Sequence, residues 1–479
     1  MSSSLCGKFF IIRYNDMPKA FLFDLNRCTG CGACVIACAT ENSRRQTLNW
    51  RQVYTFNEIH LPAVPLFNLS LGCNHCASPA CVRACPALAI TKDAETGAVI
   101  VNPEHCLGCK YCTWACPYDA PQYNSAGGVT EKCDFCHERL KNEELPACVS
   151  ICPTHALQLE DRDEKTTNPV IHGFTEAGLQ PAIRFKPLRS PQGFPECSSP
   201  SAVAAVDRLF ESSQRLPQPK ITLKSEWALL IFTSLAFCLV ALLTVSLAGP
   251  LRINPYLFIG VGTFAMGLSS IHLGKKFRAY RAIFNLKNSW LSREIFLFST
   301  FLGLTFLYLL FFPTFIWLGW IAVLVGFLGL FAIDRIYQVA MQTHPLNFHS
   351  AHTLFDGLYL TGALLGDWLL FFLFGLIKLG LYLYRKYYFK RTNRKTRPII
   401  SFLRLFFGFI IPGTLFITRP DLVPAGLNWT GLYGLFIASL LLGEFIDRTE
   451  FYDELEIVTP RKQMLTDLER SFKKRKPAG

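Results

Sequence analysis

The distribution of hydrophobic and polar positions divides this chain into two parts. Before residue 190 the apolar stretches are short and lie between cysteine-rich segments, whereas long apolar runs follow one another from residue 226 to residue 448. A run of about 20 apolar residues is long enough for a helix to cross a bilayer. We therefore expect a soluble head followed by an all-α membrane domain. Six runs reach spanning length, at residues 227–248, 255–273, 295–312, 315–333, 399–417 and 422–446.

Residues 349–388 form a further apolar stretch, which Asp367 interrupts. A single helix would hold this carboxylate near the bilayer centre, at a cost of about 2.5–3.5 kcal/mol. Two helices of about 17 residues each, meeting at Gly366 and Asp367, would bring it to the membrane surface. The membrane domain then has eight spans, with 22 basic residues on the side of the head and only Arg252 and Arg419 on the other. Seven spans would divide the same residues eight to sixteen. Because cytoplasmic loops are rich in Lys and Arg, we predict eight spans in a cell inner membrane, with a cytoplasmic head.

The net charge and the N-terminal sequence narrow the class of protein. The formal charge is +13, but the basic residues cluster between and after the apolar runs and form no stripe interleaved with aromatic residues. Membrane topology explains this distribution, and nucleic-acid binding does not. The N-terminal segment MSSSLCGKFFIIRYNDMPKA has no apolar h-region and no cleavage site. We therefore do not expect the head to be exported by a signal of its own.

Cysteines carry the chemistry of the head, because 17 of the 19 precede position 153 and 16 of these form four groups. Each group starts with C-x-x-C and ends with C-x-x-x-C. Structural zinc also uses C-x-x-C pairs, but it needs two pairs per site and rarely a third cysteine two residues later. Runs of C-x2-C-x2-C-x3-C-P instead hold iron–sulfur cubes. We therefore predict sixteen ligands and four [4Fe–4S] clusters. The groups are Cys28, Cys31, Cys34 and Cys38; Cys73, Cys76, Cys81 and Cys85; Cys106, Cys109, Cys112 and Cys116; and Cys133, Cys136, Cys148 and Cys152.

The spacing also predicts which group completes which cluster. In such runs three thiolates bind one cube and the fourth reaches a neighbouring cube. Groups two and three have the spacing of a two-cluster ferredoxin, so we expect Cys116 to complete the second cluster and Cys85 the third. By the same exchange, Cys152 would complete the first cluster and Cys38 the fourth. Short apolar stretches such as AFLFD and GAVIVN predict the strands of an α+β tandem ferredoxin-like head. The remaining cysteines, Cys6, Cys197 and Cys238, belong to no group, and we expect inert thiols there.

Both halves resemble subunits of one enzyme family. The segments RCTGCGACVIAC, SLGCNHCASPACVRACP, CKYCTWACPYDAPQYN and EKCDFCHERL resemble the iron–sulfur subunit of dimethyl sulfoxide reductase and its relatives, over about residues 20–190. In the apolar half, SEWALLIFT, HLGKKFRAYRAIFNLKNSWLSREI and LLLGEFIDRTEFY are similar to the eight-helix anchor subunit of the same reductases. The resemblance implies two subunits fused in one chain, an electron-transfer subunit followed by its quinone-reactive anchor.

The resemblance also implies where menaquinone or ubiquinone would bind. His272 in HLG and Glu294 in SREI match positions that the anchor family associates with quinol binding, and Arg278 fits a role in holding the loop or the ring oxygen. Both His272 and Glu294 border apolar runs, on the head's side of the membrane. Imidazole and an interfacial carboxylate can accept the protons that quinol releases. By position alone, both residues also fit ordinary interfacial polar side chains, and the Lys275–Lys276 pair departs from the family pattern.

We therefore expect four segments and a role in a larger complex. The segments are a four-cluster electron-transfer domain (16–190), a Pro- and Ser-rich linker (191–224), a quinone-reactive membrane anchor (225–450) and a basic cytoplasmic tail (451–479). Neither half has a pterin-binding domain or a nucleophile constellation. The chain would thus pass electrons between quinone and a large molybdopterin subunit of S- or N-oxide reductase type. One alternative is a sulfite dehydrogenase complex that reduces quinone. A membrane redox sensor is a weaker alternative, because a sensor needs one labile cluster and four clusters make a path.

Overall fold

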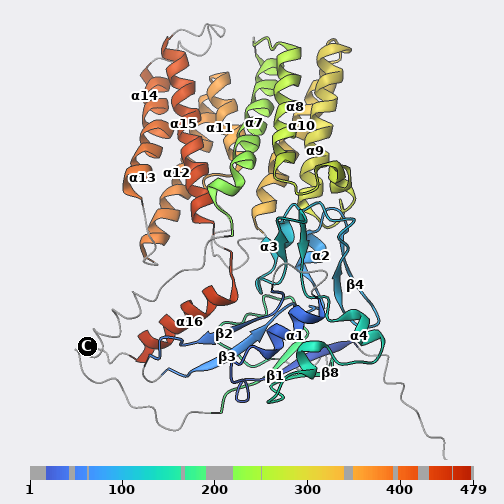
Figure 1. Cartoon of the computed structure of the whole chain (residues 1–479). Helices are drawn as coiled ribbons and strands as arrows, with labels where there is room; N and C mark the ends of the chain where they lie inside the picture. The colour runs from blue at the N-terminus through green and yellow to red at the C-terminus, as the bar shows by residue number, and fades with distance from the viewer. Residues whose placement is uncertain are drawn as a thin grey trace, which may run out of the picture.

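The structure, a computed structural model, consists of an α+β head, a helical bundle and a C-terminal helix that returns to the head (Figure 1). Most of the predicted linker, together with Cys6 and Cys197, lies outside the described residues. The structure describes residues 18–42, 49–61, 64–162, 168–189, 220–249, 251–338, 349–391, 397–418, 431–455 and 457–475.

The head is closed by a three-stranded sheet that joins its beginning to its end. Strand β1 (Lys19–Asp24) carries the predicted AFLFD stretch and lies between β8 (Leu157–Asp161) and β9 (Ile183–Lys186). It pairs antiparallel with β8 and parallel with β9, so that Phe23 lies opposite both Leu157 and Phe185. This pairing holds the first cysteine group, which follows β1, next to the fourth group, which precedes β8.

The rest of the head consists of two-stranded hairpins and short helices, as the α+β prediction requires. Helices α1, α2, α3 and α5 each contain at least one of the grouped cysteines, and α4 follows directly after Cys136. The cysteine loops are therefore fixed at the ends of regular elements. The hairpins are β2 (Gln52–Phe56) with β3 (Phe67–Leu71), β4 (Ile90–Lys92) with β5 (Val99–Val101), and β6 (Gln122–Asn124) with β7 (Val129–Glu131); the helices are α1 (Ala33–Glu41), α2 (Ala80–Ala84), α3 (Tyr111–Ala115), α4 (His137–Lys141) and α5 (Ala147–Ser150).

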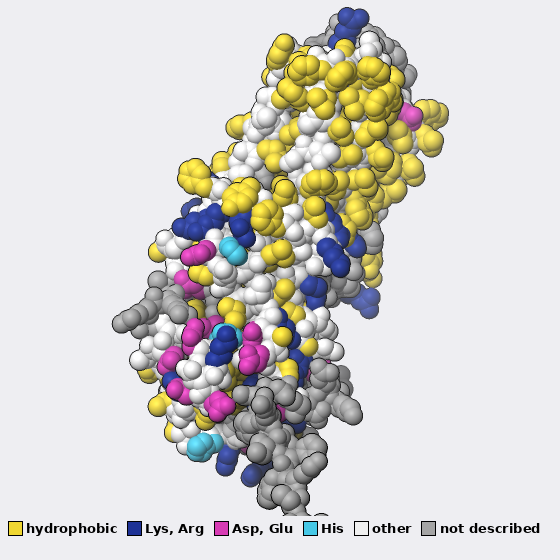
Figure 2. Space-filling view, turned by 90° about the vertical axis from the view of Figure 1, so that its right-hand side faces the viewer, with side chains coloured by type: hydrophobic (Ala, Val, Ile, Leu, Met, Phe, Trp, Pro, Cys, Tyr) yellow, Lys and Arg dark blue, Asp and Glu magenta, His cyan; other side chains and the backbone are white. Residues whose placement is uncertain are grey.

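The apolar half forms the bundle, and five of its described helices are long and apolar enough to cross a membrane, or six if α8 and the bent segment η1 count as one span. On the face shown in Figure 2, hydrophobic side chains cover most of the bundle, whereas charged side chains gather over the head, near the junction and, in small number, at the far end of the bundle. The predicted number of eight spans stays a prediction. The bundle elements are α7 (Leu223–Ala248), α8 (Pro255–Ile271), η1 (Lys276–Ile283), α9 (Trp290–Leu310), α10 (Ile316–Gln338), α11 (Thr353–Leu365), α12 (Trp368–Arg391), α13 (Pro398–Leu405), η2 (Phe406–Ile410), α14 (Ile411–Thr418) and α15 (Gly431–Glu454).

The apolar stretch around Asp367 is divided where the sequence predicts. Gly366 adopts a left-handed conformation (φ 70°) and ends α11, and the exposed Asp367 accepts a hydrogen bond from the Leu370 N–H at the start of α12 (2.9 Å). A left-handed residue after a helix favours glycine because it has no Cβ. The expected lengths are wrong, however: α11 has 13 residues and α12 has 24, because α11 begins four residues after His349, inside the predicted apolar stretch.

The C-terminal segment, predicted as a basic tail from residue 451, contains a helix that contacts the head. Helix α15 runs past the predicted boundary at residue 450 to Glu454, and α16 (Pro460–Arg475) packs against β2 of the head. Met464 and Leu468 are buried in the same core as Phe21 and Phe185, and Asp467 accepts a hydrogen bond from the Gly173 N–H (2.9 Å). Met464 and Leu468 lie about one helical turn apart on α16, so both reach this core from one face of the helix.

Candidate cluster and quinone site

The head brings its sixteen grouped cysteines together in four spatial sets. The thiols of sets 2 and 3 each line a cavity of their own. In set 1, burial raises the pKa of the Cys28 thiol, and the neighbouring thiols of Cys34, Cys152 and Cys31 raise it further. In set 4, burial raises the pKa of Cys136 to about 12, with further contributions from Cys148 and Cys38. The membership follows the exchange that the spacing predicts: set 1 is Cys28, Cys31, Cys34 and Cys152; set 2 is Cys73, Cys76, Cys81 and Cys116; set 3 is Cys85, Cys106, Cys109 and Cys112; set 4 is Cys38, Cys133, Cys136 and Cys148.

The local chemistry of these sets fits iron–sulfur cubes. Within the described part of the chain, no three Cys, His, Asp or Glu side chains converge to hold a single metal ion, whereas sets 2 and 3 each surround a cavity with four thiols. Backbone N–H groups donate to sulfur at Cys85 (from Ala89, 3.2 Å) and at Cys106 (from Gly108, 3.4 Å). Such bonds stabilise thiolates and tune cluster potentials. Burial raises the pKa of Cys81 and Cys109 to about 12, so binding of iron has to displace protons from these thiols.

Three basic side chains are buried between the sets. Arg51 is 2% exposed, donates to the hydroxyl of Ser70 (3.1 Å) and has thiols of sets 1 and 4 as its electrostatic neighbours. Lys132 lies near thiols of sets 2 and 4 and donates to the carbonyl oxygen of Cys133 (2.8 Å). His75 stacks on Phe135, with ring centroids 4.4 Å apart. Burial, followed by the charges of Lys132 and Arg51, holds the pKa of His75 well below its ordinary value.

The four sets form a line whose two ends differ. Set 3 meets the bundle, and sets 2 and 4 follow it, since Cys133 of set 4 has Cys73 of set 2 as an electrostatic neighbour. Set 1 lies at the far end, where Cys31 is exposed while Cys28, Cys34 and Cys152 are partly exposed. Next to set 1, the apolar side chains of Ile36 (68%) and Ile151 (50%) are exposed. Figure 1 shows the corresponding order, with α3 beside the bundle and α1 farther away.

The loop between α8 and α9 fastens the bundle to the cluster loops of the head. The Lys275 N–H donates to the carbonyl of Leu107 (2.9 Å), and Asn285 donates to the carbonyl of Cys85 (2.8 Å). Gly274 packs so closely that a Cβ there would lie 2.1 Å from the carbonyl oxygen of Gly128. Arg278 donates to the carbonyls of Pro103 (2.7 Å) and Cys106 (3.2 Å). These contacts favour the first of its two expected roles, which is to hold the loop, while contact with a ring oxygen stays a prediction.

His272 and Glu294 meet in one cavity at this junction. The cavity is narrow, with a volume of about 20 Å³, which is room for about one water molecule, so a quinone ring would have to displace side chains. The His272 Nδ1 atom is buried without a hydrogen-bond partner among the described residues, and Glu294 is 4% exposed. The head supplies part of the wall, including a cysteine of set 3. The lining residues are Cys109, Tyr111, Trp114, Leu229, Thr233, Ser269, His272, Leu291, Glu294, Ile333, Ile336 and Tyr337.

Sequence reasoning missed the aromatic side of this cavity. Tyr111 donates from its hydroxyl to the carbonyl of Ile336 (3.1 Å), and Trp114 stacks on Tyr337 with ring centroids 6.4 Å apart. Tyr111 and Trp114 lie inside the third cysteine group, so the cysteine spacing drew attention away from them. An apolar or aromatic residue between cluster ligands is the signal that could have indicated a surface facing the membrane.

Known protein families match both the head and the bundle. Residues 64–162 match the family model described as a 4Fe-4S dicluster domain, and residues 19–40 match a 4Fe-4S binding domain. Over 170 residues, which are 34% of this protein and 80% of the relative, the sequence is 41% identical to one of the chains of the anaerobic dimethyl sulfoxide reductase of Haemophilus influenzae. This protein belongs to the dimethyl sulfoxide reductase family. Residues 222–389 match the family's anchor subunit, described as DMSO reductase anchor subunit (DmsC), so this member of the dimethyl sulfoxide reductase family carries iron–sulfur and anchor regions together.

Other relatives of this dimethyl sulfoxide reductase-family protein differ in the reaction that their names describe. The corresponding chain of the anaerobic dimethyl sulfoxide reductase of Escherichia coli is 40% identical over 152 residues, which are 30% of this protein and 74% of the relative. One subunit of the sulfite dehydrogenase of Allochromatium vinosum is 32% identical over 203 residues, which are 36% of this protein and 83% of the relative. The iron–sulfur family models, which match residues 19–40 and 64–162, agree with the ferredoxin-like fold of the head.

Proposed function

We propose that this protein conducts electrons between membrane quinone and a separate molybdopterin catalytic subunit, through four [4Fe–4S] clusters. The observation that carries the proposal is the cavity at the junction, because Cys109 of set 3 lines it together with His272 and Glu294. A quinone headgroup in that position would lie against a cluster ligand. The family relationship supports both the iron–sulfur head and the anchor, and the weaker hypothesis of a redox sensor has no comparable support.

The residues of the head would hold and tune the electron path. When bound, each cluster accepts and releases single electrons, whereas quinone exchanges two electrons and two protons. The sixteen cysteines of sets 1 to 4 would be the ligands, with Cys85 and Cys116 exchanged between sets 3 and 2. Electrons would pass along sets 3, 2, 4 and 1. The exposed set 1, with Ile36 and Ile151 beside it, is the end that we assign to the catalytic partner.

His272 and Glu294 would handle protons at the other end. Quinol oxidation needs groups that accept protons at the ring hydroxyls, and an imidazole nitrogen without a partner can form such a hydrogen bond. The Glu294 carboxylate lies in the same cavity. Tyr111 and Trp114 of the head would flank the ring, while Arg278 keeps the α8–α9 loop against set 3. The site would therefore be complete only with the head docked on the bundle.

The proposed function can run in two directions, either from quinol to the catalytic subunit or from the catalytic subunit to quinone. Dimethyl sulfoxide reductase relatives favour reduction of an S- or N-oxide with electrons from quinol. The sulfite dehydrogenase relative favours the opposite direction, with quinone as the acceptor. The cluster and quinone sites serve both directions, because the potentials of the substrates decide which way electrons move.

Purification of the protein from its native membranes tests the proposed function. We expect a large molybdenum-containing subunit to copurify, and anaerobic metal analysis to give about sixteen iron and sixteen sulfide per chain. Candidate S-oxides, N-oxides and sulfite are then assayed with quinol and quinone. Two or more zinc ions per chain with fewer than about eight iron would overturn the cluster assignment.

Membrane orientation is a further prediction. Eight spans would place both the head and the C-terminus on the basic side of the membrane, which we propose to be cytoplasmic. Four of the 22 basic residues counted on this side, Arg385, Lys386, Arg397 and Arg448, form ion pairs with carboxylates in the bundle. The other 18 still outnumber the two basic residues on the opposite side. A reporter fused after Gly479 should be active in its cytoplasmic form. Activity of a periplasm-specific reporter alone at this position would contradict the orientation.

Replacement of Arg51 by methionine should lower the reduction potential of clusters in sets 1 and 4. The buried guanidinium has thiols of both sets as neighbours, and its positive charge favours the more negative, reduced form of a cluster. We expect a decrease on the order of 100 mV, since unit charges a few ångströms apart interact by a few kcal/mol in a protein. Redox titration followed by electron paramagnetic resonance measures the change. Arg83→Met, at an exposed arginine of α2 that bonds Ser78, is the control and should leave the potentials unchanged.

A further inference from the structure

A connected set of charged side chains lies inside the part of the bundle formed by α11, α12, α13 and α15. The side chains of Lys378, Arg404 and Asp447 are 0% exposed, and those of Asp356 and Glu444 are 1% exposed. Ionisable groups at membrane depth are costly and commonly mark proton or ion pathways. We call this set the ladder; it comprises Asp356, Lys378, Arg385, Lys386, Arg404, Glu444, Asp447, Arg448, Glu450 and Glu454.

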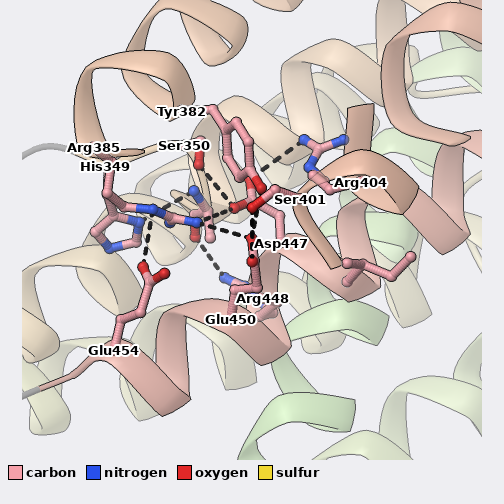
Figure 3. Close-up of polar contacts among 12 residues, drawn as sticks. His349, Ser350, Tyr382, Arg385, Ser401, Arg404, Asp447, Arg448, Glu450 and Glu454 are labelled. Carbon is pink, nitrogen blue, oxygen red and sulfur yellow. Dashed lines mark hydrogen bonds and ion pairs between the residues drawn. The ribbon is translucent and has the colours of Figure 1, made fainter. Parts of the chain in front are cut away.

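The carboxylates of the ladder follow one face of α15. Glu444, Asp447, Glu450 and Glu454 are spaced by three or four residues, which places them above one another along about 15 Å of helix. Basic residues of α12 face them: Lys378 pairs with Glu444 (2.8 Å), Arg385 with Asp447 (3.0 Å) and Lys386 with Glu454 (2.7 Å). Figure 3 shows the head-side part of this arrangement, in which Arg385 lies among Asp447, Glu450 and Glu454.

One end of the ladder opens at the head-side end of the bundle. Glu454 is 19% exposed and Lys386 is 15% exposed, whereas Lys378 at the other end is fully buried. Beside Glu454, Asp453 pairs with Arg397, whose side chain is 62% exposed. Helix α15 ends here, where the chain continues towards α16 and the head (Figure 1). The end of the ladder at Glu454 and Lys386 therefore communicates with water on the side of the head.

The buried part of the ladder also reaches the proposed quinone cavity. Tyr337 lines that cavity, and its hydroxyl is hydrogen-bonded to the hydroxyl of Tyr452 on α15. Tyr452 is one helical turn from Arg448, and Arg448 Nη1 lies 3.7 Å from Asp356 Oδ2. Asp356 in turn pairs with Lys378. Polar side chains thus lead from the cavity to the ladder, and the step from Tyr452 to Arg448 is the one that rests on helical spacing and electrostatic proximity.

Several ladder atoms require hydrogen-bond partners besides those that the described residues supply. Asp356 Oδ2, Arg448 Nη1 and Arg404 Nη1 are buried and have no hydrogen-bond partner in the described part of the chain. Buried polar atoms are normally satisfied, and water is the usual partner where protein groups do not suffice. A polar contact longer than 3.5 Å, such as the one between Arg448 and Asp356, suits a bridging water. Water is needed for a proton to pass Arg448, because arginine does not release its own proton.

We propose that the ladder carries protons between the quinone cavity and the water at the head side of the membrane. This inference rests on the proposed function. Oxidation of quinol releases two electrons, which enter the clusters singly, and two protons, which leave through Tyr337 and Tyr452 into the ladder; reduction of quinone takes up two protons by the same route. Asp356, Glu444, Glu450 and the amine of Lys378 exchange protons, and the arginines act as fixed charges. The competing role is purely structural, since five basic groups balance five acidic ones.

The test uses the full chain with its clusters, reconstituted in lipid vesicles, and follows quinol oxidation by stopped flow with a pH indicator for proton release. Glu444→Gln keeps the size and hydrogen-bonding capacity of the side chain but cannot exchange protons as a carboxylate does. We expect quinol oxidation and proton release to fall by about 100-fold, the lower end of what a positioned acid or base contributes. Glu444→Asp and added azide, a small weak acid, should restore much of the rate. Reduction of the clusters by dithionite should be unchanged.

Two controls separate a proton path from a structural ladder. Asp453→Asn removes an exposed carboxylate of α15 outside the ladder and should leave the rates at the parental level. Tyr452→Phe deletes only the hydroxyl that meets Tyr337 and should slow proton release even if Glu444→Gln does not fold. Parental rates in both Glu444→Gln and Tyr452→Phe, or a loss in Glu444→Gln that neither azide nor Glu444→Asp restores, would overturn the inference while leaving the proposed function intact. A parental chain that does not oxidise quinol would overturn both.

Discussion

Replacement of Cys109 by serine is expected to stop electron exchange between quinone and the far clusters. Cys109 belongs to set 3 and lines the cavity of His272 and Glu294, so its loss damages the cluster nearest the membrane. We expect quinol-dependent reduction of the other clusters to fall by at least about 100-fold, because an essential step of the path is interrupted. Spectra of the remaining clusters should persist, and the bundle should still insert into the membrane.

Cys238→Ser is the matched control for this prediction. Cys238 lies in α7, belongs to none of the four sets and should tolerate the change without loss of electron transfer. Iron analysis and electron paramagnetic resonance of both variants measure cluster content, and stopped-flow spectroscopy with quinol measures the rate. A Cys109→Ser protein that reduces all its clusters with quinol at the parental rate would show that electrons enter the head elsewhere.

His272→Ala and Glu294→Gln are each expected to abolish electron exchange with quinone while the clusters remain reducible by dithionite. Both side chains line the junction cavity, and each change removes a group that can accept a proton from quinol. We expect losses of about 100-fold or more, as for removal of a positioned acid or base. Activity of the whole complex with artificial dyes should remain intact, because dyes bypass the cavity.

Two substitutions at exposed positions of the head serve as matched controls. His155→Ala and Glu104→Gln change the same residue types outside the cavity and should leave quinol oxidation unchanged.

Arg278→Ala should have a different effect, because Arg278 donates hydrogen bonds to the carbonyls of Pro103 and Cys106. Its loss should loosen the α8–α9 loop and raise the apparent KM for quinol more than it lowers kcat. If His272→Ala and Glu294→Gln both turn over quinol at the parental rate, the quinone site lies elsewhere in the bundle.

The chemistry of the head can be predicted from the sequence because cysteine spacing is a local property. A loop of two residues between thiols brings three ligands to one face, whatever follows in the chain, and the exchanged fourth ligand is consistent with the two-cluster spacing. The apolar runs and the helix end at Gly366 are likewise local features. The length of an apolar run can be counted in the sequence, and a glycine that ends a helix in the left-handed conformation depends only on its own backbone. The relation to the dimethyl sulfoxide reductase family follows from the same motifs.

The junction cavity, the docking of α16 and the ladder depend on contacts between segments that are distant in the sequence. The presence of Tyr111 and Trp114 in the junction cavity depends on how the head docks on α10, and the docking of α16 depends on a core formed by strands more than 250 residues away in sequence. The ladder could not be predicted for the same reason. Lys378 and Glu444 each look like an isolated charge in an apolar run, and a lone charge there is unfavourable. Their burial is tolerable only because α12 and α15, which are far apart in sequence, bring the two opposite charges within 2.8 Å of each other. The hydropathy of one segment carries no information about a partner on another helix.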